Sequence, residues 1–222
     1  MRLQKKELKH CFQKNFNMSN QKHNIDEGYI KFNIEWINEP LCVEVPKELM
    51  LWRDKMHELK QIGHYAEINI GYGNISVKLD NGFLISGTQT GDIFPIQPNH
   101  FTLVSDYNIA QNSVVCKGPI KASSESMTHA AIYEAHPSIK AIIHIHNLDL
   151  WKTLMKKVPT TNKDVPYGTP EMANEVFRLF KETNVDKEKI IVMAGHDEGI
   201  IAFGKNLDEA GAVLLNFLTK FN

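Results

Sequence analysis

The most constraining feature of the chain is a short, nearly all apolar run, residues 139–145, that contains His144 and is followed directly by His146. The run is too short for a helix of its own and nearly free of other polar residues, so it predicts a buried central strand. Successive side chains of a strand point to opposite faces, so His144 and His146 share one face, and the isoleucines beside them point into the opposite layer. The sequence therefore presents two imidazoles together on one side of a sheet.

The rest of the chain alternates between helix-like and strand-like segments. Helical spacing of apolar residues, with cap and stop signals, predicts helices over residues 46–63, 123–135 (Ser123 or Ser124 as N-cap), 148–157, 170–183 (Thr169 as N-cap) and 207–221. Short β-like runs between turn residues predict strands at residues 28–36, 68–70, 75–79, 83–86, 101–104, 113–116, 139–145, 190–194 and 199–203. This order predicts an α/β fold, a three-layer α/β/α domain around a mostly antiparallel sheet.

Length, charge and cysteine content exclude several classes of protein. A chain of 222 residues with 42% hydrophobic content is long enough for one well-filled core. The net charge of −1 gives no general attraction for nucleic acid or anionic lipid, and no run reaches the about 20 apolar residues of a membrane span. The chain has an odd number of cysteines, and they are far apart in the sequence: Cys11, Cys42 and Cys116. This argues against a disulfide framework. We expect a cytoplasmic protein that binds neither nucleic acid nor membrane.

The first 24 residues differ from the rest in charge. They hold six basic residues against one acid and lack the apolar stretch of a secretory signal. Low hydrophobicity with excess charge predicts a disordered basic arm over residues 1–24, followed by a single domain over residues 25–222. A start at Met18, which would exclude residues 1–17 from the native protein, and a basic transit peptide are the alternatives.

The histidine pair is the first half of a candidate zinc site. A catalytic zinc site takes three protein ligands and keeps one position open. The third candidate is His196, which follows an apolar strand inside a glycine-flanked turn; Asp197 and Glu198 are alternatives that rank lower. A pair of buried structural histidines is the competing interpretation of the strand. Four further histidines compete for the third place: His64, His100, His129 and His136.

Glu125 and several small polar turns complete the candidate site. Glu125 opens the helix that leads into the histidine strand, so it comes near the metal, although a first-turn acid favoured by the helix dipole explains it equally well. Ser123 and Ser124 precede it at a helix N-terminus, where anions bind. The glycine-rich and hydroxyl-rich turns at residues 71–76 and 85–91 suit a phosphate, with tight hairpins as the alternative.

Taken in order, these pieces resemble the class II aldolase/adducin family, whose members include fuculose-phosphate aldolase. The resemblance covers about residues 46 to 222. It rests on five motifs: Gly73-Asn74-Ile75-Ser76, Leu84-Ile85-Ser86-Gly87-Thr88, Lys121-Ala122-Ser123-Ser124-Glu125 with His129, His144-Ile145-His146, and His196 before Gly199.

The resemblance implies a role for each matching residue. His144, His146 and His196 match the zinc ligands of the family, and Glu125 matches its catalytic acid/base. The phosphate-binding loops are matched by Asn74, Ser86, Gly87, Ser123 and Ser124. The expected cofactor is one Zn²⁺ per subunit, or another divalent metal.

The resemblance also implies an activity and an assembly. We expect a zinc-dependent aldolase or lyase that acts on a ketose or ketose phosphate through a metal-stabilised enediolate. A dehydratase like the methylthioribulose-phosphate enzyme, an epimerase and a non-catalytic adducin-like interaction domain are the alternatives. The expected assembly is a homo-oligomer, a tetramer by analogy.

Three features depart from the family pattern. In members of the family, glycine usually follows the third histidine ligand directly. This chain has His196-Asp197-Glu198-Gly199, with two residues inserted between the histidine and the glycine. The stretch between His146 and Gly168 is shorter than in the sugar-phosphate aldolases, and the sequence ends at Asn222 without a longer tail. These departures affect the substrate and the reaction more than the fold.

Overall fold

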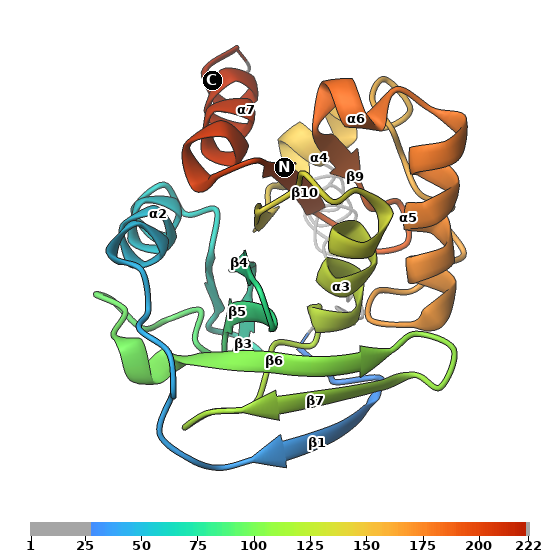
Figure 1. The fold of residues 1–222 in the computed structure, drawn as a ribbon. Helices are drawn as coiled ribbons and strands as arrows, with labels where there is room; N and C mark the ends of the chain where they lie inside the picture. Colours follow the sequence, from blue (N-terminus) through green and yellow to red (C-terminus); the bar gives the residue numbers. More distant parts are fainter. Residues whose placement is uncertain (1–27, 221–222) are drawn as a thin grey trace, which may run out of the picture.

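An eight-stranded sheet forms the centre of the protein, shown in Figure 1 as a computed structural model that describes residues 28–220. The predicted arm at residues 1–24, with Cys11 and Met18, lies outside the described residues. The helices are α2 (Lys47–Glu58), α3 (Ser126–Ala135), α4 (Leu148–Leu154), α5 (Pro170–Glu182), α6 (Val185–Glu188), α7 (Leu207–Lys220) and the short 3₁₀ helix η1 (Pro98–His100). The strands are β1 (Asn33–Ile37), β2 (Gly63–Tyr65), β3 (Ile70–Tyr72), β4 (Asn74–Leu79), β5 (Gly82–Ser86), β6 (Phe101–Asn108), β7 (Ser113–Lys117), β8 (Ala141–His146), β9 (Ile190–Val192) and β10 (Gly199–Gly204).

The strands of the central sheet follow the order β1-β7-β6-β5-β4-β8-β10-β9. Within the described chain, β1 and β7 form the one parallel pair of this sheet, and its other neighbouring pairs are antiparallel. Strand β8 lies inside the sheet between β4 and β10, so its backbone is paired on both sides. The predicted buried central strand and the mostly antiparallel sheet are confirmed.

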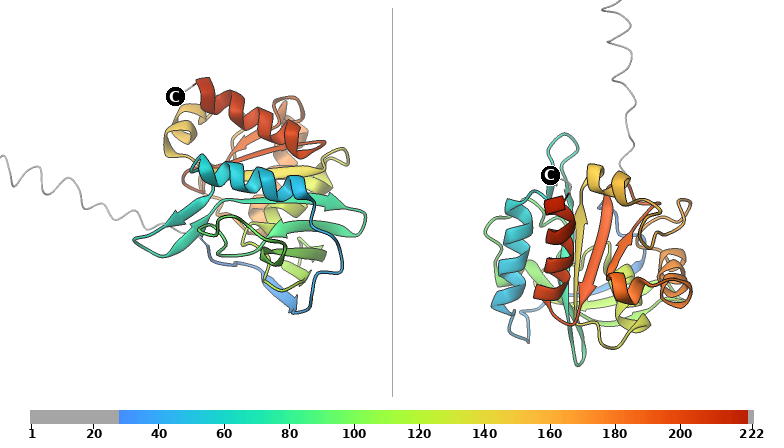
Figure 2. Two further views of the ribbon diagram at one scale, coloured as in Figure 1. Left: turned by 90° about the vertical axis from the view of Figure 1, so that its left-hand side faces the viewer. Right: turned by 90° about the horizontal axis from the view of Figure 1, so that it is seen from above.

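Helices cover both faces of the sheet and bury a separate apolar cluster on each (Figure 2). Helices α3 and α5 pack on one face, where Ile142 of β8 and Ile201 of β10 point. Helices α2, α4 and α7 pack on the other face, which takes Ile143 and Ile145. The α/β/α architecture predicted from the sequence is therefore confirmed.

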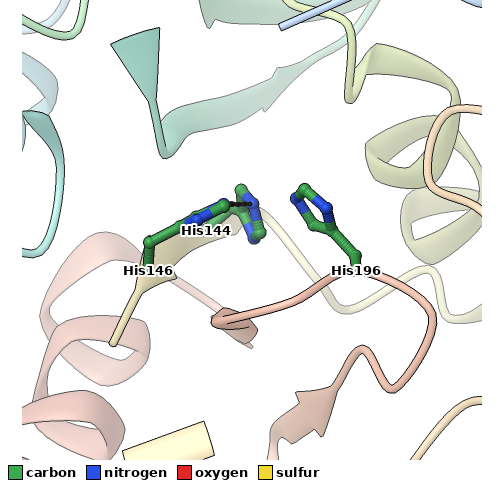
Figure 3. Close-up of side chains that lie close together, drawn as sticks. All are labelled: His144, His146 and His196. Carbon is green, nitrogen blue, oxygen red and sulfur yellow. Dashed lines mark hydrogen bonds between the residues drawn. The ribbon is translucent and has the colours of Figure 1, made fainter. Parts of the chain in front are cut away.

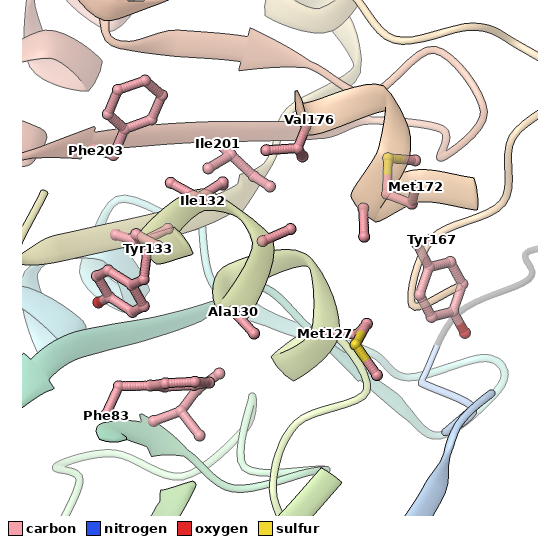
Figure 4. Packing of buried hydrophobic residues seen from close by; sticks show 14 of the residues in the cluster. Phe83, Met127, Ala130, Ile132, Tyr133, Tyr167, Met172, Val176, Ile201 and Phe203 are labelled. Atoms are coloured by element: carbon pink, nitrogen blue, oxygen red, sulfur yellow. The ribbon is translucent and has the colours of Figure 1, made fainter. Parts of the chain in front are cut away.

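Helix α3 is buried on all sides because the sheet lies under it and α5 covers it (Figure 4). Ile132 belongs to the same apolar cluster as Met172 and Val176 of α5, and the Tyr133 ring packs against Phe83 of β5 with ring centres 5.3 Å apart. Every residue from Ser126 to Tyr133 is buried, so the helix that begins beside Glu125 has little freedom to shift. Among residues 28–220, no helix is long and apolar enough to cross a membrane.

Helix α2 ends five residues before the predicted stop at Gly63. Lys60 takes a left-handed conformation with φ of 58°. The backbone N–H of Lys60 donates to His57 O and that of Gln61 to Met56 O, both at 2.8 Å, which is the pairing of a Schellman motif. Lysine occupies the position that usually takes glycine, so the stop signal was misplaced. Gly63 instead opens the hairpin of β2 and β3, where the sequence had predicted a single strand at residues 68–70.

Helix α3 begins at Ser126, three residues after the predicted start at Ser123. The hydroxyl of Ser123 accepts a hydrogen bond from Glu125 N at 3.3 Å, and its carbonyl accepts from Ser126 N and Ser126 Oγ. These local bonds compete with helical geometry, so residues 123–125 form a turn and Glu125 takes the N-cap position. By contrast, Thr169 caps α5 as predicted, because its hydroxyl accepts from Met172 N.

A buried arginine of α2 holds the loop that follows β5. The Arg53 side chain is 1% exposed, and its guanidinium donates to the carbonyls of Thr90, Gly91 and Ile93. Asp54 supports the same loop by accepting from Ile96 N at 3.0 Å. The planar fork of donors suits several carbonyls at once, which an ammonium cannot match. Loop residues 87–91 are thereby fixed against α2.

Replacement of Arg53 by alanine is expected to lower the free energy of unfolding by about 3 kcal/mol or more, because buried carbonyls lose their donors. Arg53→Lys should recover only part of this loss. Urea denaturation measures both values. Lys55→Ala, an exposed change on the same helix, is the control and should cost less than about 1 kcal/mol. Equal losses for Arg53→Ala and Lys55→Ala would contradict the structural role of the arginine.

Candidate active site

Strand β8 places two imidazoles on the face covered by α3. His144 lies opposite Asn74 of β4 on one side and Ile201 of β10 on the other, and His146 lies opposite Gly199. Pairing on both sides fixes the strand, and alternation sends both rings to the same face, as predicted. Asn74 therefore lies beside the histidine pair.

The turn after β9 brings a third imidazole to the same place. Met193 N donates to Gly199 O, and Gly199 N donates to His196 O, both at 3.0 Å. These bonds close residues 193–199 into a compact loop that directs His196 back toward β8. The inserted residues Asp197 and Glu198 form the outer part of this loop and do not displace the ring.

The three rings converge on one point (Figure 3). The Nε2 atoms of His144 and His146 are 3.1 Å apart, and candidate ligand atoms of all three histidines lie within 4.8 Å of one another. All three side chains are buried, at 0%, 4% and 3% exposure for His144, His146 and His196. The structure thus brings together the three histidines that the sequence singled out.

The competing histidines have other partners. The ring nitrogens of His64 and His136 lie within hydrogen-bond distance of Asn69 and Ser138. His100 accepts from Gln97 N. His129, on α3, lies 2.7 Å from the hydroxyl of Ser76, which also contacts Tyr133. None of the four belongs to the triad.

Burial keeps the three imidazoles neutral. It lowers the pKa of His144 to about 3 and lowers those of His146 and His196 well below the ordinary value. For His146 and His196, the neighbouring histidines lower the pKa further, since two cations at this spacing would repel. A neutral imidazole is the form that binds metal, so the environment favours a metal centre.

Glu125 reaches the triad from the start of α3. One carboxylate oxygen lies 3.6 Å from Nε2 of His196, and the side chain is 1% exposed. Burial raises its pKa to about 7, against the smaller opposing effects of Thr128 and Lys31. Since burial favours the neutral form of both groups, this contact is not an ion pair in the absence of metal.

The chemistry of these groups fits a divalent cation. Within the described residues, neither oxygen of the buried Glu125 carboxylate has a hydrogen-bond partner of normal geometry. Leaving such atoms without a partner costs about 1–3 kcal/mol each, and more when they are charged. A cation held by His144, His146 and His196 would compensate the carboxylate. The buried triad is therefore able to bind a metal ion with a carboxylate beside it.

A narrow polar cavity lies next to the triad. Most of the predicted phosphate-binding residues line it, together with backbone of the two glycine-rich turns. The lining residues are Gly28, Gly71, Gly73, Asn74, Gly87, Thr88, Gln89, Thr90, Gly91, Ser123 and Ser124. Gly91 is required here, because a Cβ at this position would lie 1.8 Å from Gly63 O. Glycine allows the loop and the hairpin of β2 and β3 to pack closely.

Ser86 is the one predicted phosphate-binding residue that does not line this cavity. Its hydroxyl accepts from Ile75 N at 3.2 Å. Along β5, Phe83 and Ile85 point toward α3, so alternation directs Ser86 to the opposite face. Its role in the structure is to join β5 to β4.

Three further residues at the site escaped the sequence analysis. The Tyr167 ring packs on His196 with ring centres 4.5 Å apart, and Lys31 Nζ lies 3.8 Å from the centre of the Tyr167 ring. The hydroxyl of Tyr65 lies 3.1 Å from Nδ1 of His146. These residues come from three separate segments, and no motif or local pattern singled them out.

The raised pKa of Glu125 predicts a pH dependence of stability in metal-free protein. Below about pH 4.5 the carboxyl is protonated in both folded and unfolded chains and has no effect. As pH rises from 4.5 to 7, the unfolded chain loses the proton before the folded chain does. The free energy of unfolding therefore falls by about 3 kcal/mol over this range, and it falls no further above pH 7. Glu125→Gln should remove this loss.

The measurement is the free energy of unfolding with a chelator present at pH 5 and at pH 8. Glu125→Gln should gain stability relative to wild type only at the higher pH. The exposed Asp197→Asn serves as control and should follow the wild-type profile. Parallel profiles for wild type and Glu125→Gln would show that the carboxyl is not held in its neutral form.

Comparison with known proteins places this arrangement in a family. Several solved structures share the fold. L-fuculose-1-phosphate aldolase from Thermus thermophilus aligns with a TM-score of 0.56 at 20% identity, over 76% of this chain and 86% of that one. A second L-fuculose 1-phosphate aldolase aligns with a TM-score of 0.58 at 22% identity, over 78% of this chain and 81% of that one. YgbL from Escherichia coli aligns with a TM-score of 0.55 at 19% identity, over 79% of this chain and 84% of that one.

A family model matches the sequence directly. The model is that of the class II aldolase and adducin N-terminal domain, and it matches residues 58–218, which include all three histidines and Glu125. This match covers well over half of the 222 residues. The chain belongs to the class II aldolase and adducin N-terminal domain family.

Proposed function

We propose that the protein is a zinc-dependent lyase of the aldolase type that acts on a ketose or ketose phosphate. The observation that carries this proposal is the meeting of three buried, neutral imidazoles with the Glu125 carboxyl at 3.6 Å from His196. The family of the chain supports the class of reaction. A homotetramer in the cytoplasm is the assembly and location that we propose by analogy.

His144, His146 and His196 would hold the metal ion, with their rings presented by β8 and by the loop before β10. A divalent ion there would supply Lewis-acid chemistry, which would polarise the oxygens of a ketose and stabilise negative charge on an enediolate. Three nitrogen ligands match zinc in a catalytic centre.

Glu125 would move the proton in the reaction. Its carboxyl is buried beside the triad, and burial raises its pKa to about 7, near neutral pH, where a group can both take and return a proton. For retro-aldol cleavage, the carboxylate would accept the proton of the substrate hydroxyl as the carbon–carbon bond breaks. The protonated carboxyl would then return a proton to the enediolate product.

The polar cavity would hold the phosphate of a sugar phosphate. Asn74 lines the cavity and lies opposite His144 in the sheet, and Ser124 lines it and precedes Glu125 in the chain. One end of a substrate would therefore lie among backbone and hydroxyl groups while its carbonyl end faces the triad. Because Asn74 lines the cavity and pairs with His144, a short phosphorylated ketose would reach both subsites.

Glu125→Gln is expected to slow turnover by about 10²–10⁴-fold while it preserves substrate binding. The assay incubates zinc-loaded protein with a panel of ketose phosphates and their unphosphorylated analogues, and it separates aldehyde and ketone products from dehydrated or epimerised ones. Removal of the metal should abolish turnover and its return should restore it. Asp197→Asn is the control for loss of a nearby charge.

Three results would contradict the proposal. Purified protein that binds no divalent ion would favour a non-catalytic interaction domain. Equal rates for wild type and Glu125→Gln would remove Glu125 from the mechanism. A dehydrated or epimerised product in place of cleavage would support one of the alternative reactions of the same site.

Ser124→Ala is expected to raise KM for phosphorylated substrates by about 10–100-fold, because a hydrogen bond to a charged group is lost. KM for an unphosphorylated analogue should stay unchanged. Ser86→Ala is a matched control, since its hydroxyl bonds Ile75 N instead of lining the cavity. The comparison is the ratio of the two KM values in each variant. The same change of this ratio in both variants would count against the cavity as the phosphate site.

A further inference from the structure

A tyrosine and a glutamate connect the inserted turn to one of the histidines. The hydroxyl of Tyr65, at the end of β2, donates to Oε2 of Glu198 at 2.7 Å. The same hydroxyl oxygen lies 3.1 Å from Nδ1 of His146. The Tyr65 oxygen thus bridges a carboxylate on one side and an imidazole nitrogen on the other.

The number of available protons sets the direction of these hydrogen bonds. The phenol has one proton, and the carboxylate of Glu198 can only accept it. The Tyr65 oxygen then acts as acceptor toward His146, so Nδ1 of His146 must carry the ring proton. This arrangement fixes His146 as the tautomer with a bare Nε2.

The bare Nε2 is the atom that faces the triad. It lies 3.1 Å from Nε2 of His144, at the point where the three rings converge (Figure 3). A hydrogen bond on the second nitrogen of a ligating histidine fixes the ring orientation and raises its basicity. Here that bond comes from Tyr65, and the carboxylate behind it is Glu198.

The backbone of Glu198 gives independent support. Glu198 has φ of 69°, in the left-handed region that favours glycine. It occupies the third position of the turn from His196 to Gly199, which Gly199 N closes by donating to His196 O. Glycine or asparagine is preferred at such a position. A glutamate there is unfavourable for the turn itself, so its side chain is the feature that needs an explanation.

Two neighbours offer matched comparisons. Tyr72 stacks against Tyr65 with ring centres 4.5 Å apart and approaches His146 with ring centres 5.4 Å apart. Its variant Tyr72→Phe removes a phenol hydroxyl of the same hairpin and leaves the bridge between Tyr65 and Glu198 intact, so it matches the chemical change of Tyr65→Phe. Asp197 precedes Glu198 in the same turn and is exposed. The loss of a nearby hydroxyl and the loss of a local charge can therefore be separated from the loss of the hydrogen-bonded bridge.

We propose that Glu198 and Tyr65 are positioning residues that fix the tautomer and orientation of His146 and thereby increase the metal affinity of the triad. The inference rests on the proposed function in one respect, that the triad holds a divalent ion. It assigns a role to the two inserted residues of this chain: they extend the turn so that a carboxylate reaches Tyr65. Neither residue is proposed to touch the substrate.

The test measures Zn²⁺ affinity of the full chain by competition with a chromophoric chelator. Tyr65→Phe and Glu198→Gly should each weaken Zn²⁺ binding by about 10–100-fold. The double variant should be no weaker than either single variant, because both changes break one bridge. Tyr72→Phe and Asp197→Asn should bind Zn²⁺ as tightly as wild type.

Glu198→Gly also separates positioning from folding. Glycine suits the left-handed backbone, so the metal-free variant should melt at the wild-type temperature or above it while its metal affinity falls. A second readout is the tautomer of His146, followed by the ring ¹⁵N shifts of histidine-labelled protein. The proton should stay on Nδ1 in wild type and distribute between both nitrogens in Tyr65→Phe.

The outcomes distinguish this inference from the proposed function. Wild-type protein that binds no divalent ion would overturn both. If wild type binds Zn²⁺ and both Tyr65→Phe and Glu198→Gly bind it with the same affinity, only the positioning role would be overturned. An equal loss of affinity in Tyr72→Phe would attribute the effect to removal of any nearby phenol hydroxyl and would overturn the positioning role. A lower melting temperature in Glu198→Gly would attribute the loss to the turn and would overturn it as well.

Discussion

The site depends on one physical constraint, the burial of imidazoles on a face of a strand that is otherwise apolar. Strand β8 lies between β4 and β10, so its backbone is satisfied and its side chains have no alternative but the two faces of the sheet. On one face, Ile143 and Ile145 pack into the apolar cluster that α2 and α7 cover. The other takes His144 and His146, which burial holds neutral.

The surrounding elements fit around this strand. Helix α3 is held between the sheet and α5, and its start places Glu125 against the triad in an environment that raises its pKa to about 7. The loop after β5 is held by buried Arg53 and forms one wall of the polar cavity. Rigid support on both sides keeps the Glu125 carboxyl and the cavity at fixed positions relative to the rings, as the proposed function requires.

The insertion between His196 and Gly199 shows how a departure from a family pattern is accommodated. The turn is lengthened, yet hydrogen bonds among Met193, His196 and Gly199 return the imidazole to β8. The added length directs Glu198 toward Tyr65 of the separate β2 and β3 hairpin. From the sequence alone, Asp197 and Glu198 would be expected to displace His196. In the structure the three histidines still converge, and Glu198 contacts His146 through Tyr65.

The sequence by itself determined the central strand, the pairing of His144 and His146 on one face, and the choice of His196, because alternation and motif order are local properties of the chain. It also predicted the layers, since the apolar pattern of each element is visible without coordinates. Only the tertiary structure decided that Ser86 points away from the cavity, that α3 begins after Glu125, and that Tyr65, Tyr167 and Lys31 lie at the site. The position of Ser86 and the presence of Tyr65, Tyr167 and Lys31 at the site depend on contacts between residues far apart in the chain, for which no short sequence pattern exists. The start of α3 depends on local hydrogen bonds of Ser123 that compete with helical geometry, and the serine pattern does not show which of the two prevails.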